Sequence, residues 1–439
     1  MSKPAKVALI AMGCEKNVVN SEQMLWLLDR AGFEMVGDPA EADVTVINTC
    51  AFIESARREA LEQIAEVMET DSKIVLAGCL AEYHKKMPLK DLPEIDGYIG
   101  AGRFDSAADA VRDVLEGRNP CYFGELDAPV SETPRIYTGP PHTACLKIAE
   151  GCDNRCSYCA IPSLRGPYRS RRMEAVLDEA RALAGRGVTE LIVIAQDTTR
   201  YGIDLYGGPR LPELLEGLCK IDGPRRLRLH YLYPGLITEQ LMDTVAAQPK
   251  IARYLDIPMQ HASDRILRAM NRRYTRADLE RLIQTLRDRI PGVVLRTSLI
   301  VGFPGETQAD YEELLDFLQN AQIPRTGIFT YSREAGTAAA ALPEQVPERT
   351  KRHRQKSIEK LQSRVADAFN RGREGSIADV LTEGYDRYAG VYYGRSEAES
   401  PDVDGVVFFT SEQPVPAGEW VRVLLDGAFG GDGKGAVIP

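Results

Sequence analysis

Short continuous apolar runs alternate with amphipathic helical patterns in the first part of the chain. KVALIAM, DVTVINT and KIVLAG are separated by helical stretches such as SEQMLWLLDRAG and ESARREALEQIAEVME. Apolar runs of this kind are typical of parallel strands that are buried on both faces. We therefore predict a doubly wound parallel α/β sheet for residues 1–128, followed by a linker rich in Pro, Thr and Gly at residues 129–142.

A second series of strands and helices covers residues 143–373. Six β-rich runs follow one another: ACLKIAE, ELIVIAQ, RLRLHYL, RYLDIPM, VVLRTSLIVG and TGIFTYS. Helical patterns occur between them at 173–186, 211–220, 238–247, 275–290 and 307–320. Six strands are two fewer than a closed barrel of this type contains, so we predict a partial, open α/β barrel that is TIM-like.

The pattern changes again over residues 374–439, where short alternating runs are broken by Gly and Pro. Examples are IADVLTEGY, YAGVYYGRS, GVVFFTS and EWVRVLLDGA. This alternation predicts a small antiparallel β-barrel. Residues 376–439 hold 4 Lys or Arg against 11 Asp or Glu, a net charge of −7, so most of the acidity of the chain lies in this module.

Composition narrows the class of protein. The chain has 439 residues, of which 44% are hydrophobic and 27% charged, as in a globular protein of two or three domains. No run approaches the roughly 18 apolar residues of a membrane span, so no membrane is expected as a partner. The nine cysteines are mostly far apart, which favours reduced thiols and a cytoplasmic location over a disulfide scaffold. A net charge of −10 argues against a protein that mainly coats nucleic acid.

Each predicted strand of the first region ends close to a cysteine. These are Cys14 in MGCEKN, Cys50 in INTC and Cys79 in AGC. The carboxyl ends of the strands form the ligand crevice in open α/β sheets, so we predict that the three thiols share a site. Three buried packing residues are the alternative, because free cysteine is often buried. Packing is our interpretation of the remaining cysteines, Cys121, Cys145 and Cys219.

A second set of three cysteines follows the first strand of the predicted barrel. EGCDNRCSYCAIP contains Cys152, Cys156 and Cys159 in CxxxCxxC spacing, so the loop is expected at the carboxyl-end face, where catalytic loops collect. Three thiolates would bind three irons of a 4Fe-4S cluster and leave the fourth open, as in a catalytic metal site. Zinc is the alternative, with a fourth ligand from His142, His230 or His261.

The CxxxCxxC loop, with Tyr158 before its third cysteine, resembles that of the radical S-adenosylmethionine (SAM) superfamily. SLIVGFPGE, with Ser298 and Gly302, is similar to the GxIxGxxGE stretch that lies near the adenine in that superfamily. Glycines there let the backbone approach a flat ligand. The resemblance implies that SAM chelates the open iron and that its reduction yields methionine and a 5′-deoxyadenosyl radical.

Over its whole length, the chain resembles the methylthiotransferases, whose last module is a TRAM domain. The resemblance implies two 4Fe-4S clusters, each with one open iron. One open iron would activate SAM and the other would carry the sulfur to be inserted. The implied ligands are Cys14, Cys50 and Cys79 for the first cluster, in a methylthiotransferase domain at 1–128, and Cys152, Cys156 and Cys159 for the second, in a radical SAM domain at 143–373.

Within this family, the chain resembles the RimO-type branch, which modifies an aspartate of the twelfth small-subunit ribosomal protein. CDNRCSYCAIPSLRGPYRSR, IAQDTTRYG, YLDIPMQHASDRILRAMNR and RTSLIVGFPGET carry the resemblance, while Glu15 and Asn20 replace its usual proline and aspartate. The alternative is the branch that modifies adenosine in transfer RNA. A terminal module at −7 would repel phosphates and attract a basic protein. The basic stretches at 346–373 and 165–172 favour the alternative, but we interpret them as solvated helix faces and partners of nearby carboxylates.

The resemblance implies a methylthio group transferred to the aspartate β-carbon, with one SAM as methyl donor and a second as radical source. Such C–H chemistry exceeds side-chain acid–base catalysis and requires a cofactor. The implied partners are the ribosomal protein, an electron donor of flavodoxin or ferredoxin type and a sulfur donor, with nucleic acid not the primary substrate. Gln196 and Asp197, after the second barrel strand, and Arg296, on the fifth, are candidate SAM contacts. The alternative for each is a polar side chain that fills the barrel mouth.

Overall fold

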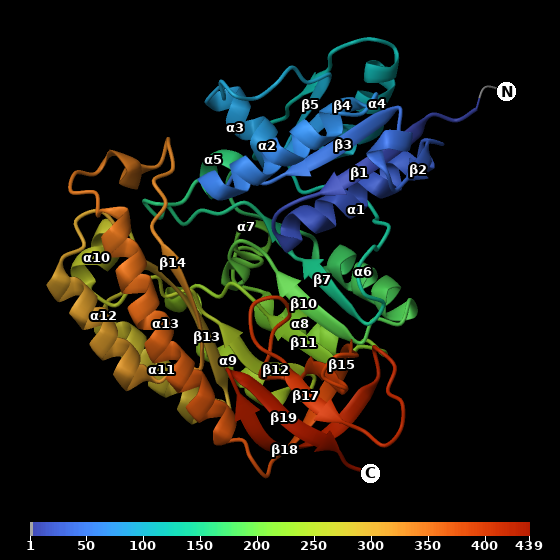
Figure 1. Ribbon diagram of the computed structural model, residues 1–439. Coiled ribbons are helices and arrows are strands. Elements are labelled where there is room, and N and C mark those ends of the chain that lie inside the picture. Colours follow the sequence, from blue (N-terminus) through green and yellow to red (C-terminus); the bar gives the residue numbers. More distant parts are fainter. Residues whose placement is uncertain (1–2) are drawn as a thin grey trace.

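The computed structural model describes residues 3–439. Its N-terminal part is a six-stranded, wholly parallel sheet with the order β2-β1-β3-β4-β5-β6 (Figure 1). The strands are β1 (Lys6–Ala11), β2 (Glu34–Val36), β3 (Val44–Thr49), β4 (Lys73–Gly78), β5 (Gly97–Gly100) and β6 (Cys121–Tyr122). The three apolar runs of the sequence form β1, β3 and β4, and the short strands β2, β5 and β6 extend the sheet on both sides.

Helices cover both faces of this sheet, as expected for a doubly wound fold. They are α1 (Glu15–Arg30), α2 (Glu54–Met68), α3 (Cys79–Lys86) and α4 (Ala107–Leu115), with short 3-10 turns at η1 (Pro39–Glu41) and η2 (Phe104–Ser106). Met24 of α1 and Val111 of α4 belong to one buried apolar cluster. Ile64 of α2 and Leu80 of α3 belong to another.

The central part is a second parallel sheet, with the order β7-β10-β11-β12-β13-β14, that does not close on itself. Its strands are β7 (Thr143–Lys147), β10 (Glu190–Ile194), β11 (Arg226–Leu229), β12 (Ile251–Asp256), β13 (Val294–Val301) and β14 (Arg325–Thr330). All six predicted strands are confirmed, and so is the open barrel. Strand β8 (Ala149–Glu150) follows β7 almost directly and pairs antiparallel with β9 (Arg169–Ser170).

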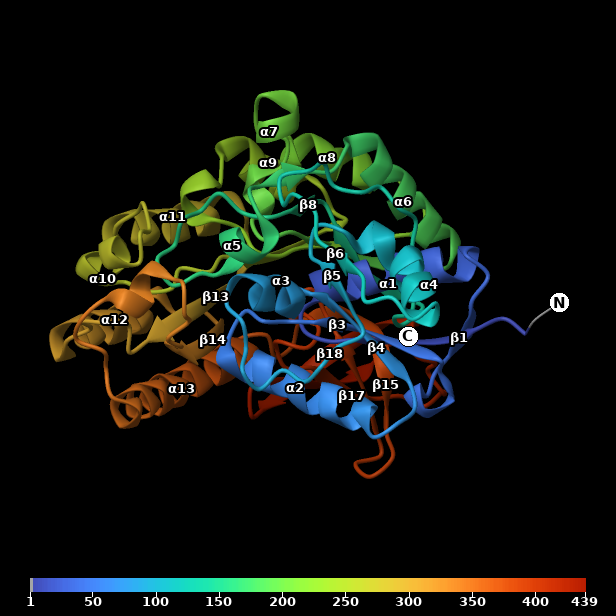
Figure 2. The same ribbon diagram turned by 90° about the horizontal axis from the view of Figure 1, so that it is seen from above.

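Helices form an arc on the outer side of this sheet (Figure 2). The main ones are α6 (Met173–Gly185), α8 (Leu211–Cys219), α9 (Glu239–Ala247), α11 (Arg276–Arg289), α12 (Gln308–Ala321) and α13 (Glu348–Arg371). The shorter ones are α5 (Ile161–Arg165), α7 (Ile203–Tyr206), α10 (Asp264–Ala269), η3 (Thr198–Arg200), η4 (Pro234–Leu236) and η5 (Ala338–Ala341). None of the helices within residues 3–439 combines the length and the apolar character needed to cross a membrane.

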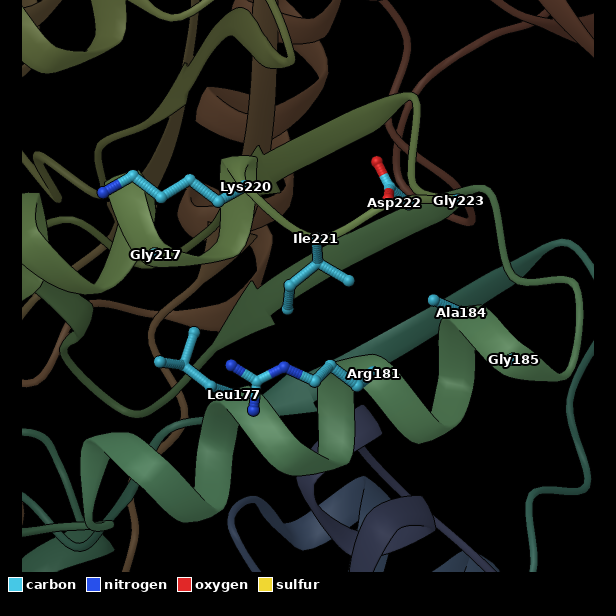
Figure 3. Close-up of a pocket in the computed structure, with 9 residues that line it drawn as sticks. All are labelled: Leu177, Arg181, Ala184, Gly185, Gly217, Lys220, Ile221, Asp222 and Gly223. Atoms are coloured by element: carbon cyan, nitrogen blue, oxygen red, sulfur yellow. The ribbon is translucent and has the colours of Figure 1, made fainter.

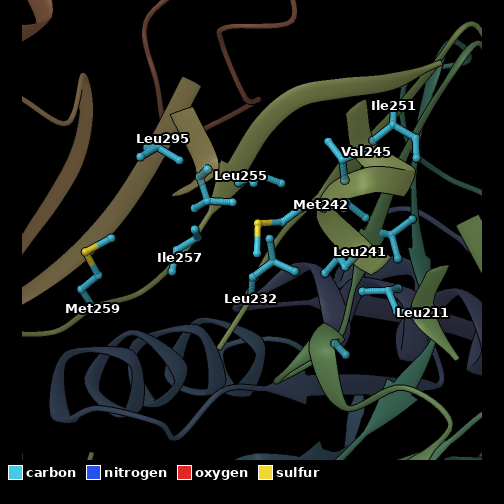
Figure 4. Packing of buried hydrophobic residues seen from close by; sticks show 14 of the residues in the cluster. Leu211, Leu232, Leu241, Met242, Val245, Ile251, Leu255, Ile257, Met259 and Leu295 are labelled. Atoms are coloured by element: carbon cyan, nitrogen blue, oxygen red, sulfur yellow. The ribbon is translucent and has the colours of Figure 1, made fainter. Parts of the chain in front are cut away.

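The core of the central part lies between the strands and these outer helices. Leu255 of β12 and Leu295 of β13 pack in one cluster with Met242 and Val245 of α9 (Figure 4). Strand β11, with the sequence RLRL, shows how the two faces are specified. Its leucines join this cluster, whereas its arginines point to the opposite face of the sheet, because successive side chains of a strand alternate.

The C-terminal part is a closed five-stranded barrel with the order β15-β16-β17-β19-β18. Its strands are β15 (Ile377–Asp386), β16 (Val391–Arg395), β17 (Val407–Thr410), β18 (Trp420–Phe429) and β19 (Asp432–Val437). The predicted barrel is confirmed, with one difference. All of its pairs are antiparallel except β17 and β19, which run parallel because the long connection from β17 to β18 lets β19 return beside β17.

Buried ion pairs attach this barrel to the inner face of the central sheet. The carboxylate of Glu190 lies 2.7 Å from Arg395, 3.2 Å from Arg228 and 3.6 Å from Arg226. Arg228 also donates to the carbonyl of Glu397 at 2.9 Å. The arginines of the RLRL strand therefore bind the terminal barrel, although their alternation alone does not identify their partner.

A second carboxylate, Glu399, is wholly buried and makes the attachment sensitive to acid. It pairs with Arg373 at 2.6 Å and Arg325 at 2.9 Å. Burial opposes ionisation, but the two arginines lower the pKa of Glu399 from 4.5 to about 2. The stability contributed by this carboxylate is therefore complete above about pH 4.5 and is lost as the pH falls towards 2.

For the native chain, we expect the urea concentration at the unfolding midpoint to decrease when the pH is lowered from about 7 to about 3. In Glu399→Gln the midpoint should be lower at neutral pH and should fall less on acidification, because the titrating group is gone. Equal acid sensitivity in both proteins would show that Glu399 does not contribute.

Candidate functional site

The structure brings Cys14, Cys50 and Cys79 together at one rim of the N-terminal sheet. They follow β1, β3 and β4, which are neighbours, so their carboxyl ends meet. A Cβ added to Gly13 would lie 2.6 Å from the Cβ of Cys50, which shows how closely the Cys14 loop passes over Cys50. The pKa of the Cys79 thiol is raised to about 11, because burial and the nearby Cys50 and Cys14 thiols together outweigh the opposing effect of Arg165.

Cys152, Cys156 and Cys159 also lie together, in the loop between β8 and α5. Backbone contacts fix this loop against α10: the Ser157 N–H donates to the carbonyl of Met270 at 3.0 Å. Burial raises the pKa of Cys159, and the neighbouring Cys156 and Cys152 thiols add to the effect. The loop lies at the carboxyl-end face, as the sequence predicts.

Tyr158 connects this loop to the turn after β13. It is half-buried and packs against an apolar cluster that includes Phe303. In the turn, the carboxylate of Glu306 accepts the N–H of Gly302 at 2.7 Å and that of Phe303 at 3.2 Å. The candidate residues Tyr158 and Gly302 therefore belong to one assembly, and Glu306 holds its backbone in place.

Gly302 cannot carry a side chain without disturbing this turn. Its φ is +74°, and an added Cβ would lie 2.2 Å from Cγ of Lys351, whose ammonium is held by the Tyr331 carbonyl at 2.8 Å. We expect Gly302→Ala to lower the free energy of unfolding by about 2–5 kcal/mol, from backbone strain and overlap together. Gly187→Ala is the matched control for chemical denaturation, because Gly187 also has a positive φ of +95° but open space around it. Equal losses in both variants would contradict the overlap.

Gln196 and Asp197 form hydrogen bonds with residues that are neighbours of the barrel cysteines in the chain. Gln196 donates to the carboxylate of Glu150 at 2.7 Å. Asp197 accepts from the amide of Asn154, between Cys152 and Cys156, at 2.6 Å and from the N–H of Thr199 at 3.1 Å. Both polar side chains therefore stabilise the cysteine loop through hydrogen bonds.

Arg296 is engaged within the protein. Its guanidinium donates to Asp256 at 2.7 Å and lies 3.9 Å from Asp404 of the C-terminal part. Burial would lower the pKa of Arg296, but Asp256 raises it overall, so the cation is permanent. Arg296 thus lies on the inner face near the terminal module and not in the cysteine loop.

Two arginines that sequence reasoning did not single out touch the thiols. Arg165 Nε lies 3.1 Å from Sγ of Cys79, and Arg272 Nη1 lies 3.4 Å from Sγ of Cys156. Both side chains are buried, at 2% and 8% exposure. The sequence places Arg165 in a basic run that we interpreted as a solvated face or as partners of carboxylates. The solvated face is wrong for Arg165 and for Arg171, which is also buried and pairs with Glu179.

The two thiol sets lie on elements that meet at the boundary between the N-terminal sheet and the barrel. Helices α3 and α5, which begin at Cys79 and just after Cys159, lie side by side (Figures 1 and 2). Ala160 and Leu164 share a buried apolar cluster with Cys79 and Ala51. A cavity of about 300 Å³ opens beside this boundary and is lined by residues that include Asn20, Lys147 and Glu150.

The donor set fits thiolate-bound clusters. Each set supplies three sulfurs, and each receives an N–H from a buried arginine. A backbone N–H, that of Ile161, also donates to Sγ of Cys159 at 3.4 Å. Hydrogen bonds to ligand sulfurs are a recurrent feature of iron–sulfur sites. Among residues 3–439, no three His, Cys, Asp or Glu side chains have the geometry to hold a single metal ion. A cluster has different needs, because each of its cysteines binds a different iron.

The remaining cysteines and histidines are placed elsewhere. Cys145 and Cys219 are partly buried, whereas Cys121 is exposed on the edge strand β6, so its expected burial is wrong. His230 Nε2 lies 2.7 Å from Oγ of Ser400. Nδ1 of His261 accepts the N–H of Ser263, the residue before α10, at 2.9 Å.

A larger groove, of about 730 Å³, lies on the outer side of the barrel (Figure 3). Leu177 and Arg181 of α6 line one side, and Lys220 and Ile221 after α8 line the other. None of its nine described lining residues is a cysteine or another candidate ligand. The groove is therefore separate from the site at the carboxyl-end face.

Three family models match the chain. The Radical SAM superfamily matches residues 146–318, the Uncharacterized protein family UPF0004 matches residues 6–100, and the TRAM domain matches residues 375–438.

Solved structures share the fold at low identity. The radical S-adenosylmethionine methyltransferase TsrM from Kitasatospora setae, solved with cobalamin and a 4Fe-4S cluster bound, superimposes with a TM-score of 0.56 at 17% identity and covers 77% of each chain. The cobalamin-dependent S-adenosylmethionine radical enzyme OxsB gives 0.52 at 12% identity over 82% of this chain and 56% of its own. These likenesses concern the fold alone.

Curated relatives match over nearly the whole length. The ribosomal protein uS12 methylthiotransferase RimO of Pelotomaculum thermopropionicum is 49% identical over 445 residues and covers 99% of each chain. Proteins of the same name from Desulforudis audaxviator and Caldanaerobacter subterraneus are 46% and 44% identical, and cover 97% and 96% of this chain and 96% and 98% of their own. With identities this high over nearly the full length, the chain belongs to the RimO family of methylthiotransferases, within the radical SAM superfamily.

Proposed function

We propose that this enzyme transfers a methylthio group to the β-carbon of an aspartate in ribosomal protein uS12. The proposal rests on the relatives named ribosomal protein uS12 methylthiotransferase RimO, which match nearly the whole chain at 44–49% identity. Two sets of three thiols, carried by elements that meet at one boundary, support the proposal, because the family resemblance implies three cysteine ligands for each of two clusters.

Cys14, Cys50 and Cys79 would hold one 4Fe-4S cluster, and Cys152, Cys156 and Cys159 a second that also binds SAM. When bound, the clusters and SAM supply the one-electron and radical chemistry that side chains cannot perform. The protein itself positions these groups. The barrel site is shaped by Tyr158, the backbone at Gly302, Gln196 and Asp197. Arg296 stabilises the inner face of the barrel.

The placement of charge supports a basic protein as substrate. Residues 376–439 have a net charge of −7, and a basic ribosomal protein would be attracted to them. We also propose a reductant of flavodoxin or ferredoxin type, a separate sulfur donor and a cytoplasmic location. The division into residues 1–128, 129–142, 143–373 and 374–439 belongs to the same proposal.

Mass spectrometry of uS12 tests the function directly. In a strain that lacks this gene, uS12 should lose the mass of the methylthio group, and the intact gene should restore it. A variant with Cys152, Cys156 and Cys159 replaced by alanine should not restore it. Unchanged modification of uS12, with altered transfer-RNA adenosines instead, would contradict the proposed substrate.

A further inference from the structure

Arg165 reaches from the barrel into the N-terminal thiol set. It ends α5, the helix that directly follows the CxxxCxxC loop, and its Nε lies 3.1 Å from Sγ of Cys79. Its Nη1 lies 3.4 Å from the carboxylate of Glu150, and its Nη2 donates to the side-chain oxygen of Asn17. The three donor nitrogens therefore face three partners, two of which belong to the N-terminal part.

The partners of Arg165 are held in turn by both parts of the chain. Glu150 is paired with Lys147 at 3.0 Å and accepts from Gln196 at 2.7 Å. Asn17 donates to the carbonyl of Thr49, the residue before Cys50, at 2.9 Å. Asn17 is fully buried and Glu150 is 6% exposed, so the guanidinium has little freedom to leave Cys79.

We propose that Arg165 is a positioning residue through which the barrel holds and tunes the metal centre at Cys14, Cys50 and Cys79, and this proposal rests on the proposed function. A cation that donates an N–H to a ligand sulfur stabilises the more negative, reduced form of an iron–sulfur centre. The contact therefore raises the reduction potential of the N-terminal centre. Arg272 makes the corresponding contact with Cys156 and acts on the barrel centre alone.

The test uses two parent proteins, each with one thiol set. In the first, Cys152, Cys156 and Cys159 are replaced by alanine, so that only the N-terminal centre remains. In the second, Cys14, Cys50 and Cys79 are replaced. Arg165→Gln, Arg165→Lys and Arg272→Gln are made in both, and each protein is reconstituted with iron and sulfide without oxygen. Iron content, circular dichroism and the midpoint potential of the remaining centre are measured.

Arg135→Gln is the structural control. Arg135 is also buried at the same boundary and pairs with Glu22 at 2.6 Å and Glu179 at 2.7 Å, but it contacts neither thiol set. A general weakening of the boundary would affect Arg135→Gln and Arg165→Gln alike. An effect through Cys79 would appear only in the latter.

In the first parent, Arg165→Gln should move the midpoint potential to a more negative value or lose iron from a folded protein, and Arg165→Lys should retain part of the native value. Arg272→Gln and Arg135→Gln should leave that centre unchanged. In the second parent, only Arg272→Gln should shift the potential. Unchanged iron and potential in Arg165→Gln, or an equal change in Arg135→Gln, would overturn the role of Arg165. A first parent that binds no iron would contradict the proposed two-cluster function itself, and the role of Arg165 with it.

Discussion

Replacement of Cys14, Cys50 and Cys79 by alanine is expected to abolish methylthiolation and leave SAM cleavage intact. The three thiols follow strands of the N-terminal sheet, whereas Cys152, Cys156 and Cys159 lie in a barrel loop. That loop is fixed by the contact of Ser157 with Met270, in which the N-terminal thiols take no part, so their loss leaves the loop in place. Product analysis by mass spectrometry should show 5′-deoxyadenosine formed at a rate close to that of the native chain. Methylthiolated uS12 should fall below detection.

Cys121→Ala is the matched control, because Cys121 is exposed and lies on the edge strand β6 of the same sheet, separated by β5 from the strands that lead to the three thiols. It should retain both products. Methylthiolation that persists in the triple variant would show that the N-terminal thiols are not required. Loss of both products, with native circular dichroism, would show that the two thiol sets are not separable.

Glu190→Ala is expected to cause the largest loss of stability. The variant takes from Arg226 and Arg228 the carboxylate that neutralises them and leaves Arg395 with Glu383 alone, and all three arginines are almost wholly buried. Removal of one partner from a buried ionic group typically costs about 3–5 kcal/mol. The free energy of unfolding, measured in urea, should fall by that amount, and the C-terminal barrel should separate first, as seen by limited proteolysis.

An exposed ion pair provides the comparison. Asp178 and Arg181 lie 2.5 Å apart on α6, but their side chains are 74% and 57% exposed. Asp178→Ala should therefore cost no more than about 1 kcal/mol. A loss in Glu190→Ala as small as this would mean that the buried arginines find other partners and that Glu190 does not secure the terminal barrel.

Local pattern determined most of the fold. β1, β3 and β4, and all six strands of the barrel, come from apolar runs long enough to be recognised. β2, β5 and β6 have two to four residues and no such run, so only their neighbours in the sheet define them. The parallel pairing of β17 with β19 could likewise not be predicted from the sequence, because alternation gives the faces of a strand but not its direction relative to a distant partner.

The site divides in the same way. The grouping of Cys14, Cys50 and Cys79 follows from parallel topology, since neighbouring strands end at one rim. The contact between Arg165 and Cys79 does not follow, because it joins residues 86 positions apart across two sheets. Spacing within the chain identifies ligands that share a loop or a rim, whereas residues that reach between domains become apparent only in three dimensions.

The most direct test of the account is a count of iron and sulfide. After anaerobic reconstitution, the native chain should hold about eight irons and eight sulfides, and each triple-alanine variant about four, because each thiol set would bind its own cluster. About four irons in the native chain, or no loss on replacement of Cys14, Cys50 and Cys79, would contradict the presence of two metal centres.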